Sequence, residues 1–351
     1  MWAEIAIGEK KSIMGGFMTA RWDVKKAGEW YKKLPWIVGC DYIPSNAVNQ
    51  LEMFQKDTFD LEINDRELGF AEGLGMNSIR VYLHDLLWKE EEGFKKTLDK
   101  FLDLAVKHKL KPLLVLFDDC WMPEPKPGKQ PAPVPGVHNS WWLKSPGLKV
   151  LANEKEWGRL EKYVKGVLKT FGKDERIFIW DLYNEPGGGN VRIPSFPLLK
   201  KTFEWAKEAD PVQPLTSGVY GPFISKDPEY REQDAFQIAE SDILTFHNYE
   251  AVNNLAGEIA ELKVFNRPVI CTEYLARGRQ SLFETCLPVF KEEKVGCYNW
   301  GLVSGKTNTI FPWGSKEGSP EPSPWHHDIF RQDGTPFDAK EIEFIKKITG
   351  A

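Results

Sequence analysis

The chain has 351 residues, of which 42% are hydrophobic, enough for a large core in two small domains or one α/β barrel with insertions. Its 46 basic and 51 acidic residues give a net charge of −5 with no basic block, so nucleic acid is not an expected partner. No apolar run approaches the ~20 residues of a membrane span, so a membrane is not an expected partner either.

The N-terminal end carries no obvious export signal. Residues 1–16 have no continuous hydrophobic stretch of the kind found in a secretory signal. The sequence as it stands is therefore expected to be cytoplasmic, whereas removal of a signal peptide would make the protein secreted or periplasmic. Residues 1–25 are interpreted as an N-terminal extension, with disorder as one interpretation, and residues 26–351 as one α/β domain.

Short apolar runs alternate with helical patterns along the rest of the chain. The predicted strands are 36–42, 78–83, 111–118, 177–182, 215–219, 243–249, 268–274 and 296–302. The predicted helices are 60–74, 94–108, 154–171, 197–209, 252–264, 281–293 and 338–348, with a further short helix in the polar stretch after residue 219. Eight alternations predict a single-domain (β/α)8 TIM barrel. A doubly wound sheet shares the alternation, but no glycine-rich phosphate turn follows the first strand, which disfavours a dinucleotide site.

Two long loops interrupt this rhythm, after strand 3 (119–147) and after strand 8 (304–325). Loops of this length in a compact domain are usually functional or disordered, and their tryptophans argue against disorder. These tryptophans are predicted either to pack within the loops or to stack on a ligand: Trp121, Trp141, Trp142, Trp313 and Trp325. The adjacent pair His326 and His327 is interpreted as a solvated pair at the rim rather than as a metal site.

The five cysteines fit no zinc pattern. Three of them lie inside predicted strands, so the chain is expected to hold buried free thiols at Cys40, Cys120, Cys271, Cys286 and Cys297.

The clearest chemical signal is a pair of glutamates where two buried strands end. The strand 177–182 leads into Asn184-Glu185-Pro186, and Pro186 cannot donate to a ladder. The strand 268–274 contains Glu273. The two glutamates are 88 residues apart, so only the fold can bring them together. Two carboxylates at the C-terminal ends of parallel strands indicate acid/base or nucleophilic chemistry at a shared site.

The remaining strand ends are rich in polar and aromatic groups, as expected of a carbohydrate site. These residues are Asp41, Tyr42, Arg80, Tyr82, His84, Asp118, Asp119, Trp121, His247, Tyr249, Asn299 and Trp300. The chain also has 14 Trp, 10 Tyr and 21 Phe, and flat apolar sugar faces stack on such rings.

In combination, these motifs resemble the clan A retaining glycoside hydrolases, the cellulase-like (family 5-type) barrels. The resemblance rests on Asn-Glu-Pro ending strand 4, Thr-Glu-Tyr ending strand 7 and a Trp ending strand 8, and it spans about residues 30–348. The region 36–142 is further similar to cellulase-like proteins labelled 1,4-β-xylanases.

The resemblance implies a double displacement that needs no metal or other cofactor. Glu185 would be the general acid/base and Glu273 the nucleophile, with the two carboxyls ~5–5.5 Å apart. The expected substrate is a β-linked oligosaccharide or polysaccharide of gluco-, manno- or xylo-configured units. The two long loops suggest a bordered pocket and therefore exo action or short substrates.

The same resemblance implies supporting roles around these glutamates. Arg80 and Tyr249 would hold Glu273 ionised, Asn184 would bind the sugar 2-hydroxyl, and Trp300 would form the platform of the −1 subsite. The substrate-binding residues expected on these grounds are Arg80, His84, Trp121, Asn184, His247, Tyr249 and Trp300. Asp118 and Asp119 match no catalytic motif of the clan and are interpreted as sugar hydroxyl ligands or loop anchors.

Two alternatives remain open. A metal-dependent barrel could use Asp118, Glu185 and Glu273 as oxygen ligands for Mg²⁺. A catalytically silent barrel could bind oligosaccharide through its tryptophans without turnover.

Overall fold

The framework of the molecule is one sheet of parallel strands. The structure, a computed structural model, describes residues 21–188, 195–220 and 228–351. Its strands are β1 (Val38–Asp41), β2 (Ser78–Tyr82), β3 (Lys111–Val115), β4 (Ile179–Asp181), β5 (Leu215–Thr216), β6 (Leu244–His247), β7 (Val269–Tyr274) and β8 (Gly296–Trp300). Within the described residues these eight strands follow the order β5-β4-β3-β2-β1-β8-β7-β6.

The sheet closes on itself between its two ends. Just after β5, Val219 forms a parallel bridge with Phe246 of β6. The Val219 amide donates to Thr245 (3.1 Å), and the His247 amide donates back to Val219 (3.2 Å). The predicted (β/α)8 barrel is thereby confirmed, with a short seam between β5 and β6.

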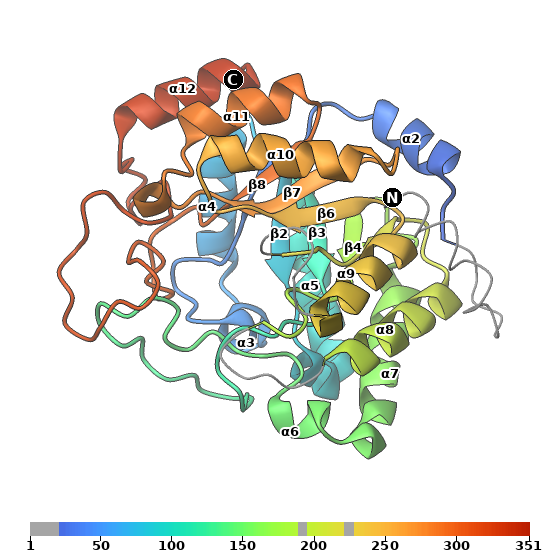
Figure 1. Cartoon of the computed structure of the whole chain (residues 1–351). Helices are drawn as coiled ribbons and strands as arrows, with labels where there is room; N and C mark the ends of the chain where they lie inside the picture. Colours follow the sequence, from blue (N-terminus) through green and yellow to red (C-terminus); the bar gives the residue numbers. More distant parts are fainter. Residues whose placement is uncertain (1–20, 189–194, 221–227) are drawn as a thin grey trace.

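Helices follow the strands and surround the sheet (Figure 1). Their bounds are α2 (Val24–Lys32), α3 (Gln50–Phe54), α4 (Leu61–Gly73), α5 (Glu91–Lys107), α6 (Leu148–Leu151), α7 (Trp157–Phe171), α8 (Phe196–Ala209), α9 (Pro228–Glu240), α10 (Val252–Lys263), α11 (Phe283–Glu292) and α12 (Ala339–Thr349). The described residues also form the 3₁₀ helices η2 (Asp85–Glu90), η3 (Glu154–Glu156) and η4 (Arg277–Arg279). None of the helices in the described ranges combines the length and apolar character needed to cross a membrane.

Helices α2 and α3 lie where the sequence predicted no helix. Helix α3 lies in a stretch expected to be a loop, because five residues are too few to show a period. It is capped by Asn49, whose side chain accepts from the Glu52 amide at 3.0 Å. Helix α2 begins inside the expected extension 1–25. Its Trp30 packs on Phe178 with ring centroids 5.2 Å apart, which ties this helix to the barrel. Residues 1–20 of that extension lie outside the described residues.

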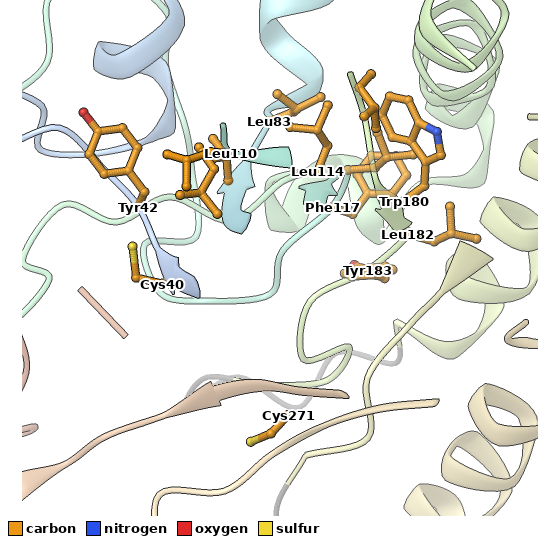
Figure 2. Packing of buried hydrophobic residues seen from close by; sticks show 14 of the residues in the cluster. Cys40, Tyr42, Leu83, Leu110, Leu114, Phe117, Trp180, Leu182, Tyr183 and Cys271 are labelled. Carbon is orange, nitrogen blue, oxygen red and sulfur yellow. The ribbon is translucent and has the colours of Figure 1, made fainter. Parts of the chain in front are cut away.

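The core has two parts because successive side chains of a strand point to opposite sides of the sheet. Along β3, Leu114 belongs to the larger cluster shared with the surrounding helices, and Leu113 and Val115 belong to a smaller one. Figure 2 shows Leu114 near Phe117 and Trp180 in the larger cluster. Each fully buried side chain of this kind contributes about 1.5–3 kcal/mol. Burial on both faces explains why the strands read as continuous apolar runs.

The two long loops contact each other over one side of the barrel mouth, and Figure 1 shows them projecting on the same side. The Asn139 amide donates to Thr307 (2.8 Å), and the Gly318 amide donates to Pro135 (3.0 Å). The Asn308 side chain donates to the Val134 carbonyl at 2.9 Å. We call the loop segments 131–142 and 305–319 the loop clasp.

The five cysteines are all buried and free, as predicted.

Candidate active site

The fold brings the two glutamates together at the C-terminal ends of β4 and β7. One carboxylate oxygen of Glu185, one of Glu273 and a ring nitrogen of His247 all lie within 4.8 Å of one another. Glu273 is inside β7, whereas Glu185 follows the end of β4 by four residues and has φ 42°. Residues other than glycine rarely adopt this left-handed conformation, and those that do cluster at functional sites.

Glu273 is buried and fully hydrogen-bonded. Its Oε1 accepts from Arg80 Nη1 (2.8 Å) and the Tyr82 hydroxyl (2.7 Å), and its Oε2 accepts from the Tyr249 hydroxyl (2.6 Å). Burial alone would raise the pKa of Glu273, but the nearby His247 and Arg80 and the two tyrosine hydrogen bonds outweigh it and lower that pKa. The carboxylate is therefore held ionised and in one orientation.

Arg80 joins the nucleophile candidate to two further carboxylates. Its side chain is 0% exposed and pairs with Asp41 Oδ1 (2.9 Å) and Asp181 Oδ2 (2.8 Å) as well as with Glu273. Its Nη2 also donates to Asn184 Oδ1 at 2.7 Å. Burial raises the pKa of Asp41 well above its usual range. Asp181 was not predicted as a site residue, although a carboxylate inside the apolar run of β4 was the available signal.

Glu185 has a weaker set of partners. Its Oε1 lies 2.8 Å from His247 Nδ1, and its Oε2 accepts from the Cys120 thiol at 3.3 Å. His247 Nδ1 is also 3.5 Å from Glu273 Oε2, so the imidazole stands between the two carboxylates. Its Nε2 is buried and has no hydrogen-bond partner among the described residues. Cys120 was expected only as a buried thiol, and nothing in its sequence context pointed to this contact.

Asp118 and Asp119 act as loop anchors in the structure. Asp118 accepts from Trp142 Nε1 (2.6 Å) and Asn184 Nδ2 (2.9 Å), and burial raises its pKa to about 7. Asp119 accepts from the Tyr183 hydroxyl (2.9 Å) and from the Gly187 amide (2.6 Å). Both acids therefore connect the end of β3 to the segment that carries Glu185. Asp118 also connects this segment to Trp142 of the long loop after β3.

Aromatic rings line the side of the site covered by the loop clasp. Trp300 packs edge-on against Tyr82 and Trp142, with centroids 5.8 and 5.7 Å apart. Trp313 packs on Tyr249 at 4.9 Å. Trp121, the residue after Cys120 in the chain, is 38% exposed, and its amide lies 3.4 Å from the Trp142 carbonyl.

The structure places three of the predicted histidines in the interior. His84 is fully buried, and its ring nitrogens contact the Leu86 amide and the Lys144 carbonyl, each at 3.1 Å. The rim interpretation of His326 and His327 is wrong, because they are 4% and 0% exposed and pack against Trp313. Chain order could not reveal this burial, because the loop clasp that covers them joins segments far apart in sequence.

The metal alternative receives a different set of ligands from the one expected. Among the described residues, the group whose ligand atoms gather closely enough is Glu185, His247 and Glu273, without Asp118. The oxygens of Asp118 instead accept hydrogen bonds from the neutral donors Trp142 and Asn184. Both oxygens of Glu273 already accept hydrogen bonds, from Arg80 and from two tyrosine hydroxyls.

The fold is shared with glycoside hydrolases of known structure. The exo-beta-1,4-mannosidase Op5Man5 from Opitutaceae bacterium strain TAV5 superposes with a TM-score of 0.63 at 16% identity, over 90% of this chain and 59% of that one. The endo-1,4-beta-mannanase from Rhizomucor miehei gives 0.58 at 14%, over 89% and 97%. GH5_18 from Streptomyces cattleya, in complex with GlcNAc, gives 0.59 at 10%, over 90% and 80%.

The sequence matches no protein-family model and no curated protein. The chain spans about three fifths of the exo-mannosidase it resembles. The label 1,4-β-xylanase is not confirmed, since these three structures carry mannosidase, mannanase or GH5_18 names. At these identities the likeness establishes the barrel fold that the chain shares with them.

Proposed function

We propose that the protein is a retaining β-glycoside hydrolase, with Glu273 as nucleophile and Glu185 as general acid/base. One observation carries the proposal: two carboxylates within 4.8 Å have unequal surroundings. Glu273 accepts from a guanidinium and two hydroxyls, whereas Glu185 is met by an imidazole and a thiol. Unequal surroundings are what separate a nucleophile from an acid, and the short separation favours retention over inversion, which needs about 6.5–9.5 Å.

The proposed reaction runs in two displacements. Glu273 attacks the anomeric carbon while Glu185 donates its proton to the leaving oxygen, which breaks the glycosidic bond and forms a glycosyl ester. Glu185, now a carboxylate, takes a proton from water, and the water oxygen attacks the anomeric carbon and releases Glu273. Asn184 is held by Arg80 and Asp118, so its amide is oriented for a sugar hydroxyl.

The structural neighbours favour a manno-configured substrate. Two of them are named for β-1,4-mannoside cleavage, one as an exo-mannosidase and one as an endo-mannanase. A variant of GH5_18 from Streptomyces cattleya is described in complex with Manβ1-4GlcNAc. β-Linked mannose is therefore the first sugar to test, before gluco- and xylo-configured ones.

The loop clasp favours exo action. Trp313 of the loop clasp contacts Tyr249, the hydrogen-bond partner of Glu273. The loop clasp therefore covers the side of the mouth next to the nucleophile. The leaving group must lie near the acid Glu185, which gives it a proton. A closed glycone side leaves room for few sugar units beyond the cleaved bond, so the enzyme would release short products from chain ends.

An activity screen tests the reaction class. The panel holds aryl β-mannoside, glucoside, xyloside, galactoside and glucuronide, together with mannan, β-glucan and xylan, each with and without chelator. We expect turnover that survives chelator, is lost in Glu273→Gln and is kept in the surface control Glu72→Gln. Loss with chelator would favour the metal alternative, and oligosaccharide binding without turnover would favour the silent barrel.

A pair of glycine variants tests the exo mode. Gly136 and Gly128 both have positive φ in the same loop, but a Cβ on Gly136 would lie 2.6 Å from the backbone nitrogen of Ser319, whereas one on Gly128 would meet nothing within 4 Å. Gly136→Ala should push the loop clasp apart, while Gly128→Ala carries the same backbone strain without the collision. On reducing-end-labelled mannohexaose, wild type and Gly128→Ala should release only the shortest products, and Gly136→Ala should add internal cleavage. Internal cleavage by wild type would refute the exo assignment.

A further inference from the structure

The thiol of Cys120 makes an unusual contact with the proposed acid/base. Its Sγ lies 3.3 Å from Glu185 Oε2, while Oε1 is taken by His247. Cys120 is 5% exposed and its own amide donates to Asp118 Oδ1 at 3.0 Å. The sulfur is thus fixed by the same anchor that holds Asn184, the residue before Glu185.

The chemistry of this contact differs from that of the nucleophile. Burial and the neighbouring Glu185 and Asp118 raise the pKa of Cys120 well above its usual range, so the thiol keeps its proton and acts as a donor. A thiol is a weak donor, whereas hydroxyl bonds to a carboxylate are short and strong. Glu273 receives two hydroxyls, at 2.6 and 2.7 Å.

Donor strength matters because a hydrogen bond to a carboxylate favours its ionised form. The nucleophile must stay ionised, so strong donors suit it. A general acid must keep its proton up to the working pH, so a strong donor on its second oxygen would impair it.

We propose that Cys120 is a positioning residue that orients Glu185 and, by being a weak donor, lets Glu185 retain its proton at higher pH. The proposal rests on the proposed role of Glu185 as acid/base. A serine hydroxyl at this position would orient Glu185 equally well, but as a stronger donor it would make Glu185 lose its proton at lower pH. An alanine methyl group would not donate to Glu185 and so would not orient it.

Two substitutions of Cys120 are expected to shift the pH dependence of activity in opposite directions. Cys120→Ser places a stronger donor in nearly the same volume, and Cys120→Ala removes the donor. Cys286→Ser is the matched control, since Cys286 is a buried thiol on α11 whose polar neighbours are Ser281 and Thr285.

The readout is the pH dependence of kcat/KM on a substrate with a poor leaving group, which needs the acid. We expect the basic limb to move to lower pH by roughly half to one unit in Cys120→Ser and to higher pH in Cys120→Ala, with Cys286→Ser on the wild-type curve. A loss of packing would lower the whole curve without moving its limb. Coincident limbs, or limbs that move in the same direction, would overturn the proposal.

A second measurement separates this inference from the proposed function. If the wild type turns over no substrate in the panel, the hydrolase proposal is at fault. The effect of each cysteine variant on the titration of Glu185 is then measured directly in the protein. The carboxyl carbon of Glu185, labelled with ¹³C and assigned with Glu185→Gln, is titrated by NMR in the wild type and the three cysteine variants. The order Cys120→Ser, wild type, Cys120→Ala in rising midpoint supports the proposal, and any other order refutes it.

Discussion

Removing the guanidinium of Arg80 should destabilise the fold in a strongly pH-dependent way. Arg80 is 0% exposed and pairs with Asp41, Asp181 and Glu273, whose side chains are 0–5% exposed. Arg80→Met keeps most of the side-chain volume and leaves three carboxylates without their cation. Breaking a buried pair by removing one partner costs about 3–5 kcal/mol.

The expected loss at pH 8 is about 5 kcal/mol, because at least one full buried pair is broken and the remaining carboxylates repel each other. Domains are stable by only about 5–15 kcal/mol, so the variant should be close to unfolding at this pH. Arg176→Met is a matched control: Arg176 also pairs with three carboxylates, Asp99, Asp103 and Asp174, but at the surface. Exposed pairs contribute about 0.2–1 kcal/mol, so the control should lose about 1–2 kcal/mol.

The sign of the pH effect follows from the proton balance. In the wild type the pKa of Glu273 is lowered, so its contribution to stability is present above its unfolded pKa and is lost as pH falls. Without Arg80, burial should raise the pKa of Glu273 and raise that of Asp41 further in the folded state. A raised folded pKa makes the native state bind more protons than the unfolded one, so the variant loses stability as pH rises. The loss should therefore be smaller at pH 5 than at pH 8, by about 2 kcal/mol or more.

Urea unfolding followed by tryptophan fluorescence at pH 5 and pH 8 measures these differences for wild type and both variants. The reasoning would be refuted if Arg80→Met and Arg176→Met lost equal stability. It would also be refuted if the loss in Arg80→Met did not depend on pH.

Three further predictions test other parts of the structure. Glu185→Ala should spare the first displacement on good leaving groups and slow it about 10²–10⁴-fold on poor ones, and equal losses in pre-steady-state assays would contradict the role of Glu185. Burial lowers the pKa of His326 to about 4, against 6.5 ordinarily, so the wild type should lose up to about 3 kcal/mol as pH falls from 6.5 to 4, and urea titration of His326→Asn should show a shallower loss. On α7, a Cβ on Gly166 would lie 2.3 Å from the Trp88 ring and one on Gly158 would meet nothing, so Gly166→Ala should cost about 1–3 kcal/mol and Gly158→Ala should add up to about 1 kcal/mol in thermal unfolding.

The sequence by itself determined the barrel and the identity of its chemical groups. Strand periods, helix periods and breaker residues are local properties of the sequence. Burial on both faces makes each strand a continuous apolar run, so the eight strand–helix alternations could be identified from the sequence. The positions of Glu185 and Glu273 at strand ends followed from the same reading, because parallel strands of a barrel deliver their C-terminal residues to one mouth.

Only the tertiary structure decided which groups meet across that mouth. Asp181 lies inside a predicted strand and Cys120 was predicted only as a buried thiol, yet one shares Arg80 with Glu273 and the other contacts Glu185. His326 looked exposed along the chain because its burial depends on ring contacts with Trp313 of one loop and His138 of the other. Hydrogen-bond partners, burial and the resulting pKa shifts are properties of contacts between distant segments, and no local period or spacing encodes them.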